Sequence, residues 1–244
     1  MATTPALVEP SSGRRVWRIG RRPSPTALRL PKPLWSYGPL PPITRGNRFD
    51  PPDGHNALLY VAASRDGAYT EVLHTLRTDA ETAQDLAAVT RSGISSARWA
   101  PVPEQWWHDI ALELTATRVV VEATIRDDMP SIALNTHQTF RYLTPRLVGV
   151  LSAAGLPPVV DNGVVMSPAR ALTRPIGGVL NTWRRQSATP ISGITYTSRV
   201  DTAVTCEALF GAYPLERSSV TVTRVDPADI VRVGLRLSGE PQPT

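Results

Sequence analysis

The chain has 244 residues and a hydrophobic content of 41%, which exclude wholesale disorder and allow one large domain or two small ones. Its single cysteine, Cys206, excludes an internal disulfide framework and a cysteine-rich zinc module, and it favours a reducing, cytoplasmic setting. The formal net charge of +5 would attract phosphates. The basic residues are scattered from Arg14 to Arg236 without a long block, so most of them are expected on a solvated surface.

The N-terminal part combines a tail, a short strand and a long loop. Residues 1–14 are small, polar and proline-containing, which predicts a flexible tail. Aromatic and β-branched residues over 16–19 predict a short strand, and the proline-rich segment 20–55 predicts a long irregular loop. No membrane span is predicted, because the longest apolar stretch, Leu147 to Val160, is too short and holds two prolines.

A buried strand and an amphipathic helix follow this loop. The apolar run over 57–62 is typical of a buried strand, and Ser64 is expected to cap the helix after it. Ala68 and Val72 recur at fourfold spacing and mark the apolar face of that helix. Glu71 lies on the border of this face, so its side chain is expected to point toward the body of the domain.

The middle of the chain is predicted to mix helices and strands. Residues 79–98 are typical of a polar helix and loop. Alternating and β-branched residues within 110–123 predict strands. Thr144 and Pro145 fit the N-cap and first position of a helix, and Gly155 would close that helix.

The C-terminal part is predicted to hold one more helix and several strands. Thr173 is expected to cap a helix that runs through Trp183. Strand-like segments then follow over 191–197, 204–210, 219–225 and 230–237. Residues 238–244 are predicted to form a tail. These elements predict one α+β domain over 15–237, with several short strands and three or four helices.

Common catalytic and metal-binding motifs do not occur in the sequence. It has no P-loop, no G-x-G-x-x-G segment and no G-x-S-x-G elbow. The four histidines have no paired spacing, so no metal site is predicted. The pair Trp106-Trp107 is expected to anchor the core, and Cys206 is expected to fill a small space in it.

Three segments stand out together and occur in a fixed order. They are the sequences VWRIG at 16–20, GNRFDPP at 46–52 with LYVA at 59–62 and TEVL at 70–73, and GITYTSR at 193–199 with CEALF at 206–210. In this order they resemble the RES domain family over residues 16–212. The block from Arg48 through Tyr60 to Glu71 is the most specific part of the match.

The resemblance implies a fold and an activity. RES domains are similar in fold to ADP-ribosyltransferases, with a split, mostly antiparallel β core flanked by helices. Family members act on NAD+ and break its nicotinamide–ribose bond by hydrolysis or phosphorolysis, so NAD+ is the substrate and no metal is implied. Many are toxins that an Xre-type antitoxin holds inactive, which would bring nucleic acid to the chain only through that partner. A homodimer is compatible with the sequence.

The residues suit this chemistry on their own terms. Arginine binds phosphate oxygens with two hydrogen bonds, so Arg18 and Arg48 are candidates to bind the pyrophosphate. Loss of nicotinamide builds positive charge on the ribose, and Glu71 is the candidate carboxylate that stabilises it. Tyr60 is expected to pack against nicotinamide or to hydrogen-bond the substrate. Ser198 is the candidate polar residue of the site.

Alternatives stay open at this point. Thr173 is a second candidate for the polar residue beside Ser198. Two of these residues have a purely structural alternative. Arg18 would form a salt bridge, and Glu71 would lie on a solvated helix face. The same fold would also suit an ADP-ribosyltransferase that modifies a macromolecule. A basic, non-enzymatic module that binds nucleic acid is the alternative from another class, and it predicts steeply salt-dependent binding.

Overall fold

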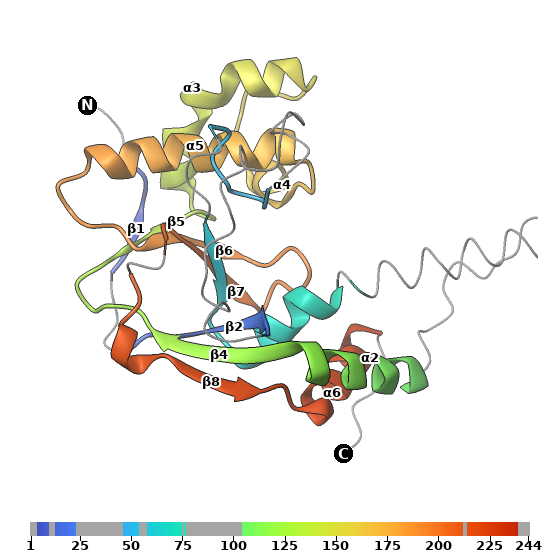
Figure 1. The fold of residues 1–244 in the computed structure, drawn as a ribbon. Helices are drawn as coiled ribbons and strands as arrows, with labels where there is room; N and C mark the ends of the chain where they lie inside the picture. The colour runs from blue at the N-terminus through green and yellow to red at the C-terminus, as the bar shows by residue number, and fades with distance from the viewer. Residues whose placement is uncertain are drawn as a thin grey trace, which may run out of the picture.

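The computed structural model describes residues 4–9, 13–22, 46–53, 58–74, 76, 104–211 and 214–238. In these residues the chain forms one sheet of eight strands in the order β1-β5-β6-β7-β3-β2-β4-β8 (Figure 1). The strands are β1 Leu7–Val8, β2 Arg15–Arg21, β3 Leu59–Ala62, β4 Arg118–Thr124, β5 Ser131–Ala133, β6 Gly193–Thr197, β7 Thr205–Leu209 and β8 Thr221–Arg224. All neighbours are antiparallel except β5 and β6, which are parallel.

Helices flank this sheet in two groups. Their bounds are α2 Glu104–Thr117, α3 His137–Ala153, α4 Asn162–Met166, α5 Arg170–Gln186, α6 Pro227–Leu237 and an unlabelled helix over 65–74. α5 packs on α3 and α4, whereas α2 packs on α6 (Figure 1). The predicted α+β class, with a mostly antiparallel core flanked by helices, is confirmed. None of the described helices has the length and apolar character needed to cross a membrane.

Three apolar clusters form in the described residues, and strand alternation decides which side chains of β3 join which cluster. Leu59 and Val61 belong to the second cluster, and Tyr60 and Ala62 face the largest one beneath the helices. The register of β3 against β7 places Ala62 opposite Cys206. Strand alternation in the structure, rather than the uniformly apolar sequence of β3, therefore places Tyr60 on the helix-covered face of the sheet.

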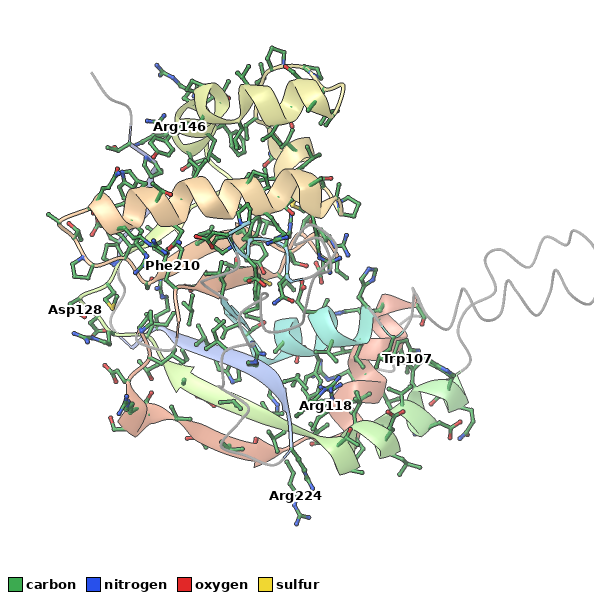
Figure 2. All side chains as sticks on the ribbon, turned by 45° about the horizontal axis from the view of Figure 1, so that its top comes forward. Trp107, Arg118, Asp128, Arg146, Phe210 and Arg224 are labelled. Atoms are coloured by element: carbon green, nitrogen blue, oxygen red, sulfur yellow. The ribbon has the colours of Figure 1, made fainter. Side chains whose placement is uncertain are left out.

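Trp107 anchors the pair α2 and α6, as the sequence predicted. Its side chain is fully buried, and its Nε1 donates to Ser238 Oγ at 3.1 Å (Figure 2). A Cβ atom at Gly234 would lie 2.3 Å from Trp107 Cδ2, so α6 approaches the indole closely enough to require glycine there. Trp106 meets Trp107 edge to face, with ring centroids 4.6 Å apart.

The strand predicted over 110–114 is wrong, because this segment belongs to α2. The buried residues of α2 are Trp107, Ala111 and Leu114, spaced by four and three as on one helix face. Leu112, which the alternation grouped with Ile110 and Leu114, is 71% exposed. The second half of the predicted strand region is confirmed as β4.

Thr144 and Pro145 lie inside α3 rather than at its start, so the predicted cap is wrong. The helix begins one residue after Thr136, whose side chain accepts a hydrogen bond from Thr139 N. Gly155 lies directly after the C-cap with φ of 68°, as the predicted end of the helix requires. The start was missed because a threonine before a proline imitates a cap.

Two further predictions fail near the C-terminus. Thr173 does not cap α5, since the N-cap is Ala169 and the helix begins at its next residue. Residues 230–237 belong to α6 and not to a strand. Asp226 caps this helix through a 2.9 Å hydrogen bond from a backbone N–H, and Pro227 takes the first position, which fixes a helical start.

Three further predicted strands and one predicted helix cap agree with the structure, whereas the flexible tail predicted over 1–14 contains a strand. The strands over 191–197, 204–210 and 219–225 appear as β6, β7 and β8, and Ser64 Oγ accepts from Gly67 N at 3.0 Å at the start of its helix. Within the predicted N-terminal tail, β1 pairs with β5. The segment 79–98 and most of the proline-rich loop lie outside the described residues.

Candidate active site

A cavity of about 610 Å³ gathers four of the predicted site residues, Arg18, Arg48, Tyr60 and Glu71. Its walls come from β2, β3, β6, β7, the helix over 65–74 and the segment that leads into α5. The other residues that line the cavity are Trp17, Ile19, Asn47, Val61, Ala62, Ala68, Val72, Ser167, Pro168, Arg170, Tyr196, Arg199 and Cys206. The sequence segments that were separate in the chain therefore meet at one place.

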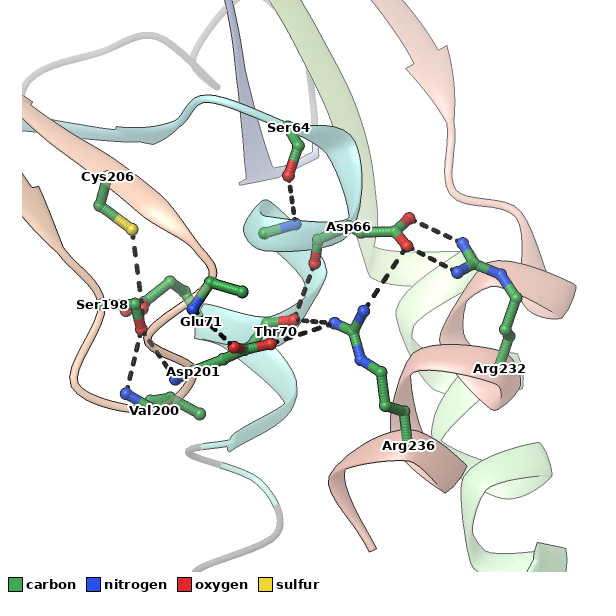
Figure 3. A network of polar contacts seen from close by, with 12 residues as sticks. Ser64, Asp66, Thr70, Glu71, Ser198, Val200, Asp201, Cys206, Arg232 and Arg236 are labelled. Atoms are coloured by element: carbon green, nitrogen blue, oxygen red, sulfur yellow. Dashed lines mark hydrogen bonds and ion pairs between the residues drawn. The ribbon is translucent and has the colours of Figure 1, made fainter. Parts of the chain in front are cut away.

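Glu71 is the carboxylate among the residues that line this cavity, and one of its oxygens is held in place. Ser198 Oγ donates to Glu71 Oε1 at 2.5 Å, and Cys206 Sγ lies 3.7 Å from the same atom (Figure 3). Burial, and then the Glu71 carboxylate, raise the pKa of the Cys206 thiol, so it remains protonated as a weak donor. Among the described residues, none donates to Oε2, which leaves that oxygen for a ligand.

The Ser198 hydroxyl is oriented by the turn that follows β6. Its oxygen accepts hydrogen bonds from Val200 N at 3.0 Å and from Asp201 N at 3.4 Å (Figure 3). These bonds occupy its acceptor positions, so its proton is directed at the Glu71 carboxylate. Ser198 is fully buried and does not line the cavity. It contacts Glu71, rather than the space where a substrate would lie.

Thr173, the second candidate for the polar residue, lies elsewhere in the core. It is fully buried in α5, and its Oγ1 donates to Ala169 O of the same helix at 3.4 Å. It does not line the cavity. The structure therefore brings Ser198, and not Thr173, to the carboxylate.

Arg18 reaches the cavity from β2 across the neighbouring strand. Its Nη1 donates to Tyr60 O at 2.9 Å, and its Nε is buried without a partner. Burial lowers the pKa of Arg18, which means that the charged form is poorly solvated. Few contacts offset the cost of burying this guanidinium, so it is suited to bind an anion as its counter-charge.

Arg48 has a similar environment on the opposite wall. Its Nη2 donates to Val165 O, and its Nε is buried without a partner. The guanidinium lies over two rings, 4.9 Å from the Phe49 centroid and 5.4 Å from the Tyr196 centroid. Burial lowers the pKa of Arg48. Both predicted phosphate ligands thus bond to backbone carbonyls and rings instead of carboxylates.

The loop that carries Arg48 is fixed by a buried aspartate. Asp50 Oδ2 accepts from Asn47 N at 2.7 Å, and Asp50 Oδ1 accepts from Leu58 N at 3.1 Å. Arg174, itself buried in α5, donates to Asp50 O and Pro51 O, each at 3.0 Å. The side-chain contacts of Asp50 explain the aspartate of the GNRFDPP segment, which closes the loop rather than contacting a ligand.

Close packing of α5 completes the support of this loop. A Cβ atom at Gly177 would lie 1.8 Å from Phe49 O, so the helix backbone meets the loop backbone directly. Tyr60 reaches the same loop from β3: Phe49 N donates to Tyr60 Oη at 2.8 Å, and Tyr60 Oη lies 3.3 Å from Asp50 Oδ1. The Tyr60 hydroxyl therefore holds the loop, and its ring contributes to the cavity wall.

A network of ion pairs anchors the helix of Glu71 from behind. Arg232 of α6 donates to both oxygens of Asp66, at 2.6 and 2.7 Å, and to Asp229 at 3.0 Å (Figure 3). Arg236 donates to Thr70 Oγ1 at 2.9 Å and lies 3.8 Å from Asp201. Thr70 adjoins Glu71, and Asp201 belongs to the turn of Ser198. This network therefore supports both residues of the Ser198–Glu71 hydrogen bond.

Sequence reasoning missed several cavity residues. Arg170 begins α5 and Arg199 follows Ser198, and both are exposed residues that line the cavity. Tyr196 lines it from β6, and burial raises the pKa of its hydroxyl well above the usual value. Arg199 and Tyr196 lie inside the GITYTSR segment, so the segment carried a signal for them. No sequence signal singled out Arg170 among the scattered arginines.

No metal centre is seen in the described part of the chain, where no group of three or more His, Cys, Asp or Glu side chains could hold an ion. His108 pairs with Glu104 on the exposed face of α2 at 3.4 Å.

Comparison with known proteins gives one family and a distant structural likeness. Residues 15–230 match the RES domain. Among solved structures, the crystal structure of the M. tuberculosis MbcT-MbcA toxin–antitoxin complex is similar to this chain, with 12% sequence identity and a TM-score of 0.47. That likeness covers 96% of this chain and 92% of that chain. None of the curated proteins matches the sequence.

Proposed function

The chain belongs to the RES domain family, and we propose that it is an enzyme that consumes NAD+ by cleaving the nicotinamide–ribose bond. The observation that carries the proposal is the oriented Glu71 carboxylate, which shares one cavity with Arg18 and Arg48. Such a site combines a fixed negative charge for the ribose with positive charges for the pyrophosphate.

The chemistry needs little more than this arrangement. As the C1′–N bond breaks, its electron pair moves to the pyridinium nitrogen, and nicotinamide leaves as a neutral molecule. No general acid is therefore required. Positive charge develops on the ribose, and Glu71 Oε2 is the oxygen free to stabilise it. The oxygen of water or phosphate then bonds to C1′, and the acceptor loses one proton.

The neighbours of Glu71 support this role. The Ser198 hydroxyl and the Cys206 thiol both contact Oε1 and so fix the direction of Oε2. Ser198 is therefore a positioning residue in this proposal. Tyr196 and Tyr60 form apolar walls against which the nicotinamide ring can pack.

Partners follow from the family. We propose that the chain is the toxin of a cytoplasmic toxin–antitoxin pair and that an Xre-type antitoxin covers this cavity. Nucleic acid would then meet the chain only through the antitoxin.

The test is incubation of the pure protein with NAD+, with and without phosphate, and mass analysis of the products. Nicotinamide release is expected, and Glu71→Gln is expected to lower its rate about 100- to 1,000-fold because the fixed charge is lost. The matched control is Glu113→Gln, which changes an exposed glutamate of α2. ADP-ribose as the second product identifies water as the acceptor, and its phosphorylated form identifies phosphate.

Other results would favour other functions. A mass increase on a target protein, with little free ADP-ribose, would favour transfer to a macromolecule. No nicotinamide release from folded, partner-free protein would contradict the proposal, and steeply salt-dependent DNA binding would then support the nucleic-acid module.

A further inference from the structure

The cavity holds more positive charge than a dinucleotide pyrophosphate requires. Four arginines and one carboxylate line it: Arg18, Arg48, Arg170, Arg199 and Glu71. A pyrophosphate diester carries two negative charges, which Arg18 and Arg48 alone can match. Two arginines therefore remain without an assigned anion.

These two arginines differ from the others in their position. Arg18 and Arg48 are half-buried, whereas Arg170 and Arg199 are exposed and so form the rim of the cavity. They come from separate elements, the first turn of α5 and the turn after β6. An anion bound at this rim would lie nearer the entrance than one bound by the half-buried Arg18 and Arg48.

Their charges are not used within the fold. In the part of the chain that the structure describes, neither Arg170 nor Arg199 has a carboxylate within ion-pair distance. Arg199 instead repels Arg48 and contributes to the lowered pKa of that guanidinium, after burial. Like charges held together at a cavity are favourable only when an anion is bound there.

The start of α5 adds to the positive electrostatic potential at the rim of the cavity. The N-cap Ala169 has no side chain that could accept a hydrogen bond from the first-turn N–H groups. α5 has 17 residues, so the positive end of its dipole lies beside Arg170.

We propose that Arg170 and Arg199 form a second phosphate subsite at the rim of the cavity, separate from Arg18 and Arg48. This proposal rests on the proposed function and specifies its substrates: a phosphate group other than the pyrophosphate takes part. The group is the 2′-phosphate of a phosphorylated dinucleotide or free inorganic phosphate that acts as the acceptor. Both carry between about one and two negative charges at neutral pH and present phosphate oxygens that arginine binds in the same way.

The kinetic test compares NAD+, NAD+ with inorganic phosphate, and NADP+ as substrates. The variants are Arg170→Gln, Arg199→Gln and their combination. The matched control combines Arg217→Gln with Arg224→Gln, which removes two exposed arginines of η5 (Arg217–Ser219) and β8 outside the cavity. The double variant in the cavity is expected to lose about 10- to 100-fold where the phosphate group contributes, and the control less than about threefold.

The pattern of losses identifies the source of the phosphate. If kcat/KM falls at least about tenfold more for NADP+ than for NAD+, the subsite binds the 2′-phosphate. If KM for inorganic phosphate rises at least about tenfold, and by more than KM for NAD+, the subsite binds the acceptor. If the kinetic constants change equally for all three substrate conditions, or change no more than in the control double variant, the proposal is overturned.

A binding experiment keeps this proposal separate from the proposed function. Calorimetry with inorganic phosphate, AMP and adenosine 2′,5′-bisphosphate needs no turnover, so it remains informative if the protein does not cleave NAD+. Weaker binding of phosphate or the bisphosphate by the double variant, by about tenfold or more, supports the subsite even then. Equal binding by wild type and double variant overturns it.

Discussion

Two arginine clusters in this molecule use the same side chain in opposite ways. Behind the helix of Glu71, Arg232 bonds to both oxygens of Asp66 and to Asp229, so its charge is fully matched. In the cavity, Arg18 and Arg48 bond to backbone carbonyls, and their Nε atoms are buried without partners. In these two clusters, the arginine that stabilises the fold is paired with protein carboxylates, whereas the two arginines of the cavity are not.

The difference has an energetic basis. Exposed ion pairs contribute about 0–1 kcal/mol each, because water screens them, and they need no further partner. A half-buried guanidinium without a counter-charge costs free energy in the empty protein and regains it when an anion binds. Function is therefore expected to depend on the cavity arginines, and stability on the α6 network.

Within this comparison of the two clusters, the largest effect is expected from removing the Arg48 guanidinium. Arg48→Gln removes a pyrophosphate ligand and is expected to raise KM for NAD+ about 10- to 100-fold. Its melting temperature is expected to stay close to that of wild type, because the desolvated charge contributes little to stability. Steady-state kinetics and calorimetric melting of each variant measure both quantities.

Arg232→Gln is the matched variant, and it is expected to change the melting temperature more than KM. It breaks the bonds to Asp66 and is expected to lower the melting temperature, with less effect on KM than Arg48→Gln. If Arg48→Gln instead lowered the melting temperature and left KM unchanged, the distinction between the two clusters would be wrong.

A smaller effect is expected from the Ser198–Glu71 hydrogen bond, which joins the cavity to the ion-pair network of α6. Ser198→Ala removes the hydrogen bond to Glu71 Oε1, and the carboxylate becomes free to rotate. We expect kcat to fall about tenfold, with KM for NAD+ changed much less, since a bond to a charged group contributes about 1.5–3 kcal/mol in proteins. Ser198→Thr keeps the hydroxyl and is expected to restore part of kcat. A larger change in KM than in kcat would place Ser198 in substrate binding instead.

Much of the site could be predicted because its parts follow local rules. Helical periodicity predicts that Glu71 points toward the body of the domain, where it lines the cavity, and the apolar run over 57–62 predicts the buried strand that carries Tyr60. The order of the segments in the chain indicated the family. Arg18 and Arg48 were predicted through the family resemblance, and their positions in or beside apolar or proline-rich segments supported that prediction.

Other features depend on contacts that a single sequence does not reveal. Arg170 and Arg199 become distinctive only once the fold brings both to the wall of the cavity. The choice between Ser198 and Thr173 needed the turn after β6 to approach Glu71. Among the elements, α2 was missed because Leu112 is an exposed leucine that completes a false alternation.

The smallest effect is expected from Asp66, and its sign depends on pH. Arg232 hydrogen bonds hold the pKa of Asp66 below its usual 3.8. The folded protein therefore binds fewer protons than the unfolded chain, and this stabilisation is present above pH 3.8 and is lost as pH falls through the folded pKa. Asp66→Asn should lower the free energy of unfolding by about 1 kcal/mol at pH 7 and by less at pH 3.

Urea denaturation at both pH values measures this difference, and a double-mutant cycle with Arg232→Gln isolates the pair. The coupling free energy is expected at pH 7 and should shrink at pH 3, where more of the Asp66 carboxyl is protonated. It should also shrink in high salt, because both side chains are partly exposed. A coupling that stayed constant with pH and salt would show that Asp66 stabilises the helix through packing and not through charge, and the contrast with the unmatched arginines of the cavity would then lose its electrostatic basis.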